Sequence, residues 1–149
     1  MLQSNIGKVI NLFISPKDKD REAKDIISVD ENGIIDDKFY AKNRERSILV
    51  TSNDSYLLAK EKQIDIPQGS LGENILIDIN PYELSVDDKI IIGKVELIVT
   101  QNCTICNSLS KIDAKLPAIL KCDRGIFTKT LQTGKIKKGD KVQIIKAIS

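Results

Sequence analysis

The sequence predicts a mainly β protein, a closed or nearly closed β-barrel with one or two short helices. Short runs rich in β-branched residues recur along the chain and are separated by turns that contain glycine. A barrel pairs the edges of many such strands without leaving them exposed. The length of 149 residues fits one domain, and we find no linker or internal repeat. We therefore treat residues 1–149 as a single domain.

In the first half of the chain, apolar runs alternate with charged loops. The charge-alternating segment 17–22 is typical of a solvated loop, although it could also grip a ligand. Ser52, Asn53 and Asp54 are helix N-cap candidates before an amphipathic segment. Ile75, Ile77 and Ile79 share one face of an alternating run, which indicates a strand. We predict strands over residues 8–14, 26–29, 47–51 and 73–79, and a short helix over 56–62.

The second half contains the clearest hairpin. Gly93 suits the first position of a type II′ turn between two β-branched runs. Residues 104–121 have apolar residues near helical spacing, but Pro117 requires a break or a new start there. Residues 138–140 form a turn before the last run. We predict strands over residues 89–92, 95–100, 125–131 and 141–148.

Composition excludes several classes of function. With no histidine, the chain cannot form a Ser-His-Asp triad, a Cys-His dyad or a His-ligated zinc site. A net charge of +2 and 4% aromatic residues argue against a nucleic-acid partner, although local basic clusters are compatible with this balance. No apolar run approaches the roughly 20 residues that span a bilayer. The first residues do not resemble a signal peptide, so we expect a cytoplasmic protein without membrane contact.

The segment Cys103-Thr104-Ile105-Cys106 carries two thiols at a spacing that supports disulfide exchange or sulfur transfer. Cys103 follows a predicted strand and precedes a candidate helix, whose dipole would favour a thiolate. The alternative is that both are small buried residues. Cys122 is the third cysteine, and we interpret it as structural. Three cysteines lack the fourth ligand of a cysteine zinc site, so no internal zinc is expected.

Two further segments are candidates for binding an anion. Gly69-Ser70-Leu71-Gly72-Glu73-Asn74 could present backbone amides, but it is not a P-loop because no Gly-Lys-Ser/Thr follows. Lys42, Arg44 and Arg46 precede a predicted strand. If this segment is extended, Arg44 and Arg46 share a face and could fork onto a phosphate. A plain loop and a solvated strand entry are the alternatives.

In order along nearly the whole chain, about residues 6–146, these pieces resemble the MOSC domain, named for the C-terminal part of molybdenum cofactor sulfurase. The resemblance includes small stand-alone bacterial members. Asp36 and Asp87 stand where the family pattern has glycine. The matching segments are Gly33–Asp37, Arg46–Leu49, Gly69–Ile75 (the family's Gly-x-x-Gly-Glu-Asn-Leu), Leu84–Gly93, Cys103, Arg124–Phe127 and Gly134–Asp140.

The resemblance implies a pseudo-barrel that binds a molybdopterin-type cofactor, or that carries sulfur as a persulfide for metal–sulfur centres. It implies Cys103 as the sulfur bearer, with Cys106 as a resolving thiol. An anionic ligand would contact Arg46, Arg124 and the backbone of Gly72, Glu73 and Asn74. Sulfur transfer would need a separate cysteine desulfurase or a molybdoenzyme partner, since the chain has no room for a pyridoxal-phosphate domain. The alternative is a non-catalytic barrel that binds an anionic ligand or a partner.

Overall fold

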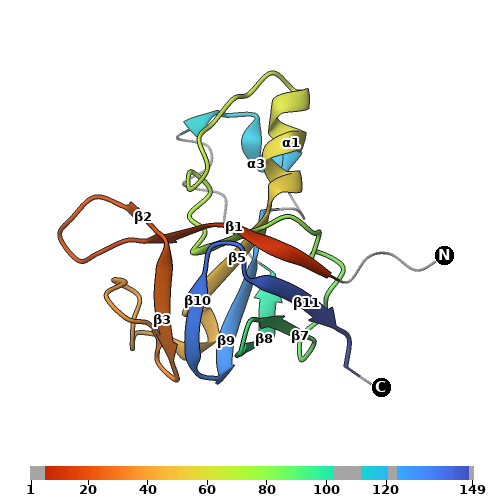
Figure 1. The fold of residues 1–149 in the computed structure, drawn as a ribbon. Helices are drawn as coiled ribbons and strands as arrows, with labels where there is room; N and C mark the ends of the chain where they lie inside the picture. Colours follow the sequence, from red (N-terminus) through yellow and green to blue (C-terminus); the bar gives the residue numbers. More distant parts are fainter. Residues whose placement is uncertain (1–5, 103–111, 121–123, 148–149) are drawn as a thin grey trace.

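The computed structural model describes residues 6–102, 112–120 and 124–147. It confirms a mainly β fold in which most strands are short (Figure 1). The expectations about Cys103, Cys106 and Cys122 lie outside the described residues. The strands are β1 (Ile6–Ile14), β2 (Glu22–Lys24), β3 (Ile26–Asp30), β4 (Gly33–Ile34), β5 (Ile48–Ser52), β6 (Ile75–Ile77), β7 (Lys89–Ile92), β8 (Val95–Asn102), β9 (Ile126–Gln132), β10 (Gly134–Lys137) and β11 (Lys141–Ile145).

Seven strands close into a barrel, as the many short strands predict. Their order is β11-β7-β8-β9-β5-β6-β1, and β1 also pairs with β11, which joins the two ends. β5 and β6 are parallel, whereas the other pairs in this ring are antiparallel. β2 continues the sheet beyond β1 as a three-residue strand. β1 pairs with three neighbours along its length. Its first residues close the barrel against β11, and its last residues pair with β2 at the base of the loop between β1 and β2.

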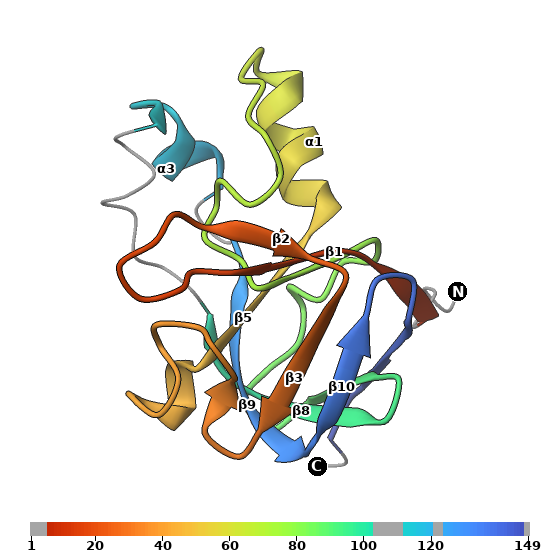
Figure 2. The same ribbon diagram turned by 60° about the vertical axis from the view of Figure 1, so that its left-hand side comes forward.

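A second sheet has the order β10-β3-β4, and Figure 2 shows β3 and β10 side by side. Sequence analysis matched residues 134–140 to a closing turn and did not predict a strand there. The structure places strand β10 at Gly134–Lys137, paired antiparallel with β3, and the turn follows it. The prediction of a strand near residues 26–29 is confirmed.

Two helices lie together beyond one end of the barrel (Figures 1 and 2). α1 spans Asn53–Glu61 and begins at Ser52, whose Oγ accepts a hydrogen bond from the Asp54 amide at 3.1 Å. α3 spans Leu116–Ile119 with Pro117 in its first turn, so the proline marks a new start rather than a break. No helix in the described ranges is long and apolar enough to cross a membrane.

The core consists of two apolar clusters separated by β6. Ile75 and Ile77 belong to the cluster inside the barrel, whereas Leu76 belongs to the cluster under α1 and α3. All three residues are fully buried, so β6 is buried on both faces. This strand therefore carries the helical layer on one side and the barrel core on the other, and the segment just before it lies where the two layers meet.

Candidate functional site

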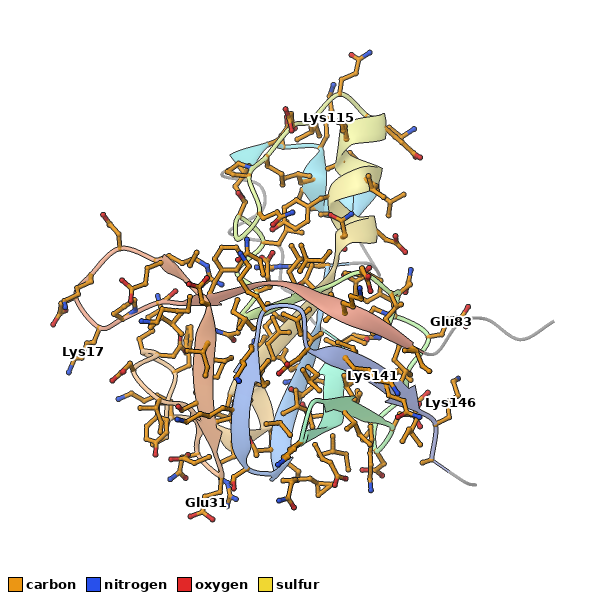
Figure 3. The ribbon with its side chains drawn as sticks, in the orientation of Figure 1. Lys17, Glu31, Glu83, Lys115, Lys141 and Lys146 are labelled. Carbon is orange, nitrogen blue, oxygen red and sulfur yellow. The ribbon has the colours of Figure 1, made fainter. Side chains whose placement is uncertain are left out.

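One pocket of about 500 Å³ lies where the loops after β1, β4 and α1 approach β5 and β9. Five of its lining residues are cationic and none of them is acidic. Figure 3 shows other lysines on the surface away from one another, such as Lys17 on the loop before β2 and Lys115 beside α3. The lining residues are Ser15, Arg21, Lys38, Phe39, Lys42, Asn43, Arg46, Ser47, Leu49, Gly72, Asn74, Arg124 and Phe127.

Arg46 lines the pocket but its neighbour Arg44 does not. The two arginines are not in an extended segment, as we had considered, but in a 3-10 turn, η1 (Arg44–Arg46). Asn43 caps this turn by accepting a hydrogen bond from the Glu45 amide at 3.0 Å. The turn separates the arginines: Arg44 Nε donates to the Glu31 carbonyl at 3.0 Å, while the Arg46 guanidinium stacks 4.6 Å from the centre of the Phe127 ring. The condition for a fork of two arginines is therefore not met, and of the two only Arg46 lines the pocket.

Arg124 is 8% exposed and reaches the pocket from the segment before β9. Its Nε and Nη2 lie 3.4 and 3.3 Å from the Leu71 carbonyl, which accepts from both. Its own carbonyl accepts a hydrogen bond from Thr51 Oγ1 at 2.8 Å. Gly72, with φ of +87°, follows Leu71, and a Cβ there would lie 3.7 Å from Arg124 Nη2. The glycine turn thus aims a carbonyl at the arginine and fixes its position.

Asn74 lines the pocket and connects three segments. Its Oδ1 accepts from the Leu49 amide at 3.0 Å, and its Nδ2 donates to the Phe13 carbonyl at 3.3 Å. Its own amide donates to the Leu49 carbonyl at 2.9 Å, and the Gly72 amide donates to the Gly69 carbonyl at 3.1 Å. These two amides are among the groups expected to contact an anion. Both N–H groups have protein acceptors in this structure, and their contact with a ligand stays a prediction.

Glu73 lies behind the pocket and not among its lining residues. Its side chain is fully buried, and its Oε2 accepts hydrogen bonds from the Tyr56 hydroxyl at 2.6 Å and the Gly69 amide at 3.1 Å. Burial and then the Glu73 charge raise the pKa of Tyr56 well above its ordinary value. The Glu73 side chain therefore ties the glycine loop to α1, while the expected contact of its backbone with a ligand stays a prediction.

Asp37 is a buried residue that shapes the opposite side of the pocket. Its Oδ1 accepts from the Ser15 amide at 2.7 Å, and its Oδ2 accepts from the Phe39 amide at 3.1 Å. These bonds fix the start of the loop that carries Lys38 and Phe39 to the pocket. Asp37 therefore has an organising role, and its carboxylate is occupied by backbone donors.

Sequence reasoning missed Lys38 and read Arg21 as part of a solvated loop. Both side chains line the pocket. The alternation of charges in residues 17–22 was the only signal near Arg21, and most of that segment is exposed. The charge pattern alone cannot show that the last cation of the loop turns inward. Lys42, in contrast, belonged to the predicted basic group, and it too lines the pocket.

The sulfur-bearing candidate Cys103 and its partner Cys106 lie outside the described residues, as does Cys122. The first described range ends at Asn102, which is the last residue of β8 and directly precedes Cys103 in the sequence. Asn102 pairs with Ile126, and Gln101 pairs with Phe127, which lines the pocket. Within the described ranges, no three Cys, Asp or Glu residues form a metal-binding group.

A closed β-barrel with a helical layer and one cationic pocket defines the molecule as a small barrel protein with a candidate anion site. The sequence model of the MOSC domain matches residues 36–143, and the chain belongs to the MOSC domain family. The fold and the recognised family therefore agree, and the departures at Asp36 and Asp87 do not remove the chain from it.

Solved structures show the same fold. YuaD from Bacillus subtilis has a TM-score of 0.84 at 18% identity, covering 99% of this chain and 100% of its own. YiiM from Geobacillus stearothermophilus has a TM-score of 0.67 at 14% identity, covering 96% of this chain and 75% of its own. YiiM from Escherichia coli has a TM-score of 0.68 at 17% identity, with coverage of 95% and 71%. A comparison with curated proteins found no match.

Proposed function

We propose that the protein binds an anionic molybdopterin-type cofactor in this pocket and serves metal–sulfur cofactor assembly. The observation that carries the proposal is the set of five cations, with no carboxylate among the lining residues. Phosphate-bearing ligands are bound by such sets through charge-assisted hydrogen bonds. The aromatic residues Phe39 and Phe127 add flat surfaces beside these cations. This donor set fits a flat heterocycle that carries an anionic group.

Arg46 and Arg124 are the residues that would hold the anionic group. Arg46 is stacked on Phe127, which leaves its edge as the hydrogen-bonding surface. Arg124 is held by the Leu71 carbonyl, so its charge is positioned before a ligand arrives. A bound molybdenum cofactor would supply the metal and its sulfur ligands, whereas the protein supplies binding and orientation.

A thermal-shift titration with isolated molybdopterin tests this proposal. Binding to the folded state alone raises the melting temperature in proportion to the logarithm of ligand concentration. We expect stabilisation of the wild type and of Cys103→Ser, because the proposed contacts do not use the thiol. Arg46→Gln should weaken the response. No stabilisation of the wild type at saturating ligand would reject cofactor binding.

A second candidate function is that Cys103 carries sulfur as a persulfide. The observation that favours it is that β8, whose last residue Asn102 directly precedes Cys103 in the sequence, pairs with β9, the strand that bears Phe127 of the pocket. The Cys103 thiolate would attack the terminal sulfur of a persulfide on a cysteine desulfurase. A new S–S bond forms at Cys103, the donor's S–S bond breaks, and the donor leaves as a thiolate. The protein would then act with a separate enzyme as its sulfur source.

Intact-mass spectrometry tests the carrier function after incubation with a cysteine desulfurase and cysteine. We expect the mass of one added sulfur atom on the wild type, its loss on treatment with a reductant, and no addition on Cys103→Ser. Cys106→Ser is the matched control, and it should still accept sulfur, with slower release if Cys106 resolves the persulfide. An equal adduct on Cys103→Ser would place the sulfur elsewhere and refute the assignment.

A further inference from the structure

Arg21 is a cation of the pocket whose hydrogen-bonding capacity is only partly used. It lies just before β2 and lines the pocket together with Arg46 and Arg124, which come later in the chain. Its Nη1 donates to Ser15 Oγ at 2.6 Å. Its Nε and Nη2 are buried and have no hydrogen-bond partner in the part of the chain that the structure describes. A buried donor without a partner is rare and costs free energy, so these two atoms call for an explanation.

The two unpartnered atoms lie on one edge of the guanidinium. Nε–H and one N–H of Nη2 point the same way and form the fork that binds two oxygens of a carboxylate or phosphate. The third nitrogen, Nη1, is the one that Ser15 holds. The Phe13 ring lies 5.6 Å from the guanidinium carbon and supports the group from one side. The side chain is therefore tethered at one end, with its two-oxygen fork unfilled.

No carboxylate in the described part of the chain forms an ion pair with this fork. Glu73 is the carboxylate that acts most strongly on Arg21, followed by Asp37, but among the described residues no ion pair within 4.0 Å joins Arg21 to either. Burial lowers the pKa of Arg21 below its ordinary value, since the charged form loses hydration. Asp37 is engaged with backbone amides, and Glu73 Oε2 accepts from Tyr56 and the Gly69 amide. The other oxygen, Glu73 Oε1, is buried and has no hydrogen-bond partner among the described residues.

We propose that Arg21 is the specificity-determining residue of the pocket and selects a dianionic oxyanion group, such as a phosphate monoester, over a monoanion of the same shape. This inference rests on the proposed function in one respect, that the pocket holds an anionic ligand. Arg21 lines the pocket, so two oxygens of a bound oxyanion can fill its fork. Its charge adds to those of Arg46, Arg124 and Lys38, which line the same space, and the full set balances the second negative charge of the ligand.

Calorimetric titration with two matched probes tests the inference at about pH 8, where a phosphate monoester is a dianion. Phenyl phosphate and phenyl sulfate have the same shape and differ by one charge. We expect the wild type to bind phenyl phosphate about tenfold more tightly than phenyl sulfate, the size of one charge-assisted contact. Arg21→Gln should bind both probes with similar affinity. Arg21→Lys should restore part of the preference, because it returns the charge without the fork.

Arg44→Gln is the matched control, since Arg44 has the same side chain and does not line the pocket. It should keep the wild-type preference. Equal binding of the two probes by the wild type, or an unchanged preference in Arg21→Gln, would overturn the inference. Circular dichroism and melting temperature identify variants that fail to fold, and for those Arg21→Lys decides the result.

The outcome separates this inference from the proposed function because neither probe is the cofactor. If molybdopterin fails to stabilise the protein while the Arg21-dependent preference for phenyl phosphate is present, the proposed cofactor is wrong and the inference stands. If molybdopterin binds and Arg21→Gln retains the preference, the inference is wrong and cofactor binding stands.

Discussion

At the scale of single residues, two aspartates occupy positions that suit glycine. Asp36 and Asp87 have φ values of +76° and +77°, in the left-handed region. The family resemblance marks both positions as glycine in other members, and the structure gives the physical reason. Aspartate tolerates this conformation better than most residues but still bears a cost. The fold therefore keeps the same turns with a less favourable residue in each.

Replacing either aspartate with glycine should stabilise the protein. We expect Asp36→Gly and Asp87→Gly each to raise the free energy of unfolding by about 0.5–1 kcal/mol, because glycine removes the strain of a left-handed residue. Urea unfolding measures the change. Asp65→Gly is the control, because Asp65 is not among the residues with positive φ, and it should not gain stability. A loss of stability in both test variants would contradict the strain argument.

At the scale of elements, the alternating and β-branched patterns located most barrel strands. The sequence predicts the hairpin of β7 and β8 because a glycine, Gly93, suits the turn between two β-branched runs. The structure has this hairpin, and Gly93 has a φ of +58°. The patterns missed β2 and β4, which are three and two residues long. Such strands carry too few residues for a period to be visible, and their pairing with β1 and β3 depends on distant neighbours.

The contact between α1 and the glycine loop predicts a pH effect. Tyr56 is buried on α1 and donates to Glu73, so its pKa lies far above the ordinary 10.0. The folded state therefore keeps the phenol proton at a pH where the unfolded state loses it. This stabilisation is complete below about pH 10 and declines above it, by up to about 1.4 kcal/mol per pH unit.

Denaturant unfolding of the wild type and Tyr56→Phe between about pH 9 and pH 11 checks this effect. The variant loses the hydrogen bond to Glu73 and should be less stable at pH 9. The stability difference between the two proteins should then shrink as pH rises, because only the wild type has the Tyr56 proton to lose. A difference that stays constant across this range would show that Tyr56 does not titrate differently in the two states.

At the scale of the whole molecule, the pocket assembles residues from four separated parts of the chain, within 15–21, 38–49, 72–74 and 124–127. The Gly69–Asn74 segment and Arg124 could be recognised from family-like motifs, and the structure brings Gly72, Asn74 and Arg124 to the same pocket as Arg46. Their proposed roles as ligand contacts stay a prediction. Arg21 and Lys38 could not be predicted, because their inward positions depend on Ser15 and on buried Asp37. The near-neutral net charge also hides a local surplus of cations.

The central claim is that this cationic pocket is where an anionic cofactor binds. The most direct test measures the affinity of isolated molybdopterin for Arg46→Gln and Arg44→Gln, two adjacent arginines of η1 of which only Arg46 lines the pocket. We predict that Arg46→Gln weakens binding roughly tenfold, because one charge-assisted contact is lost, while Arg44→Gln binds as the wild type does. Equal losses in the two variants, or unchanged binding by Arg46→Gln, would contradict the claim.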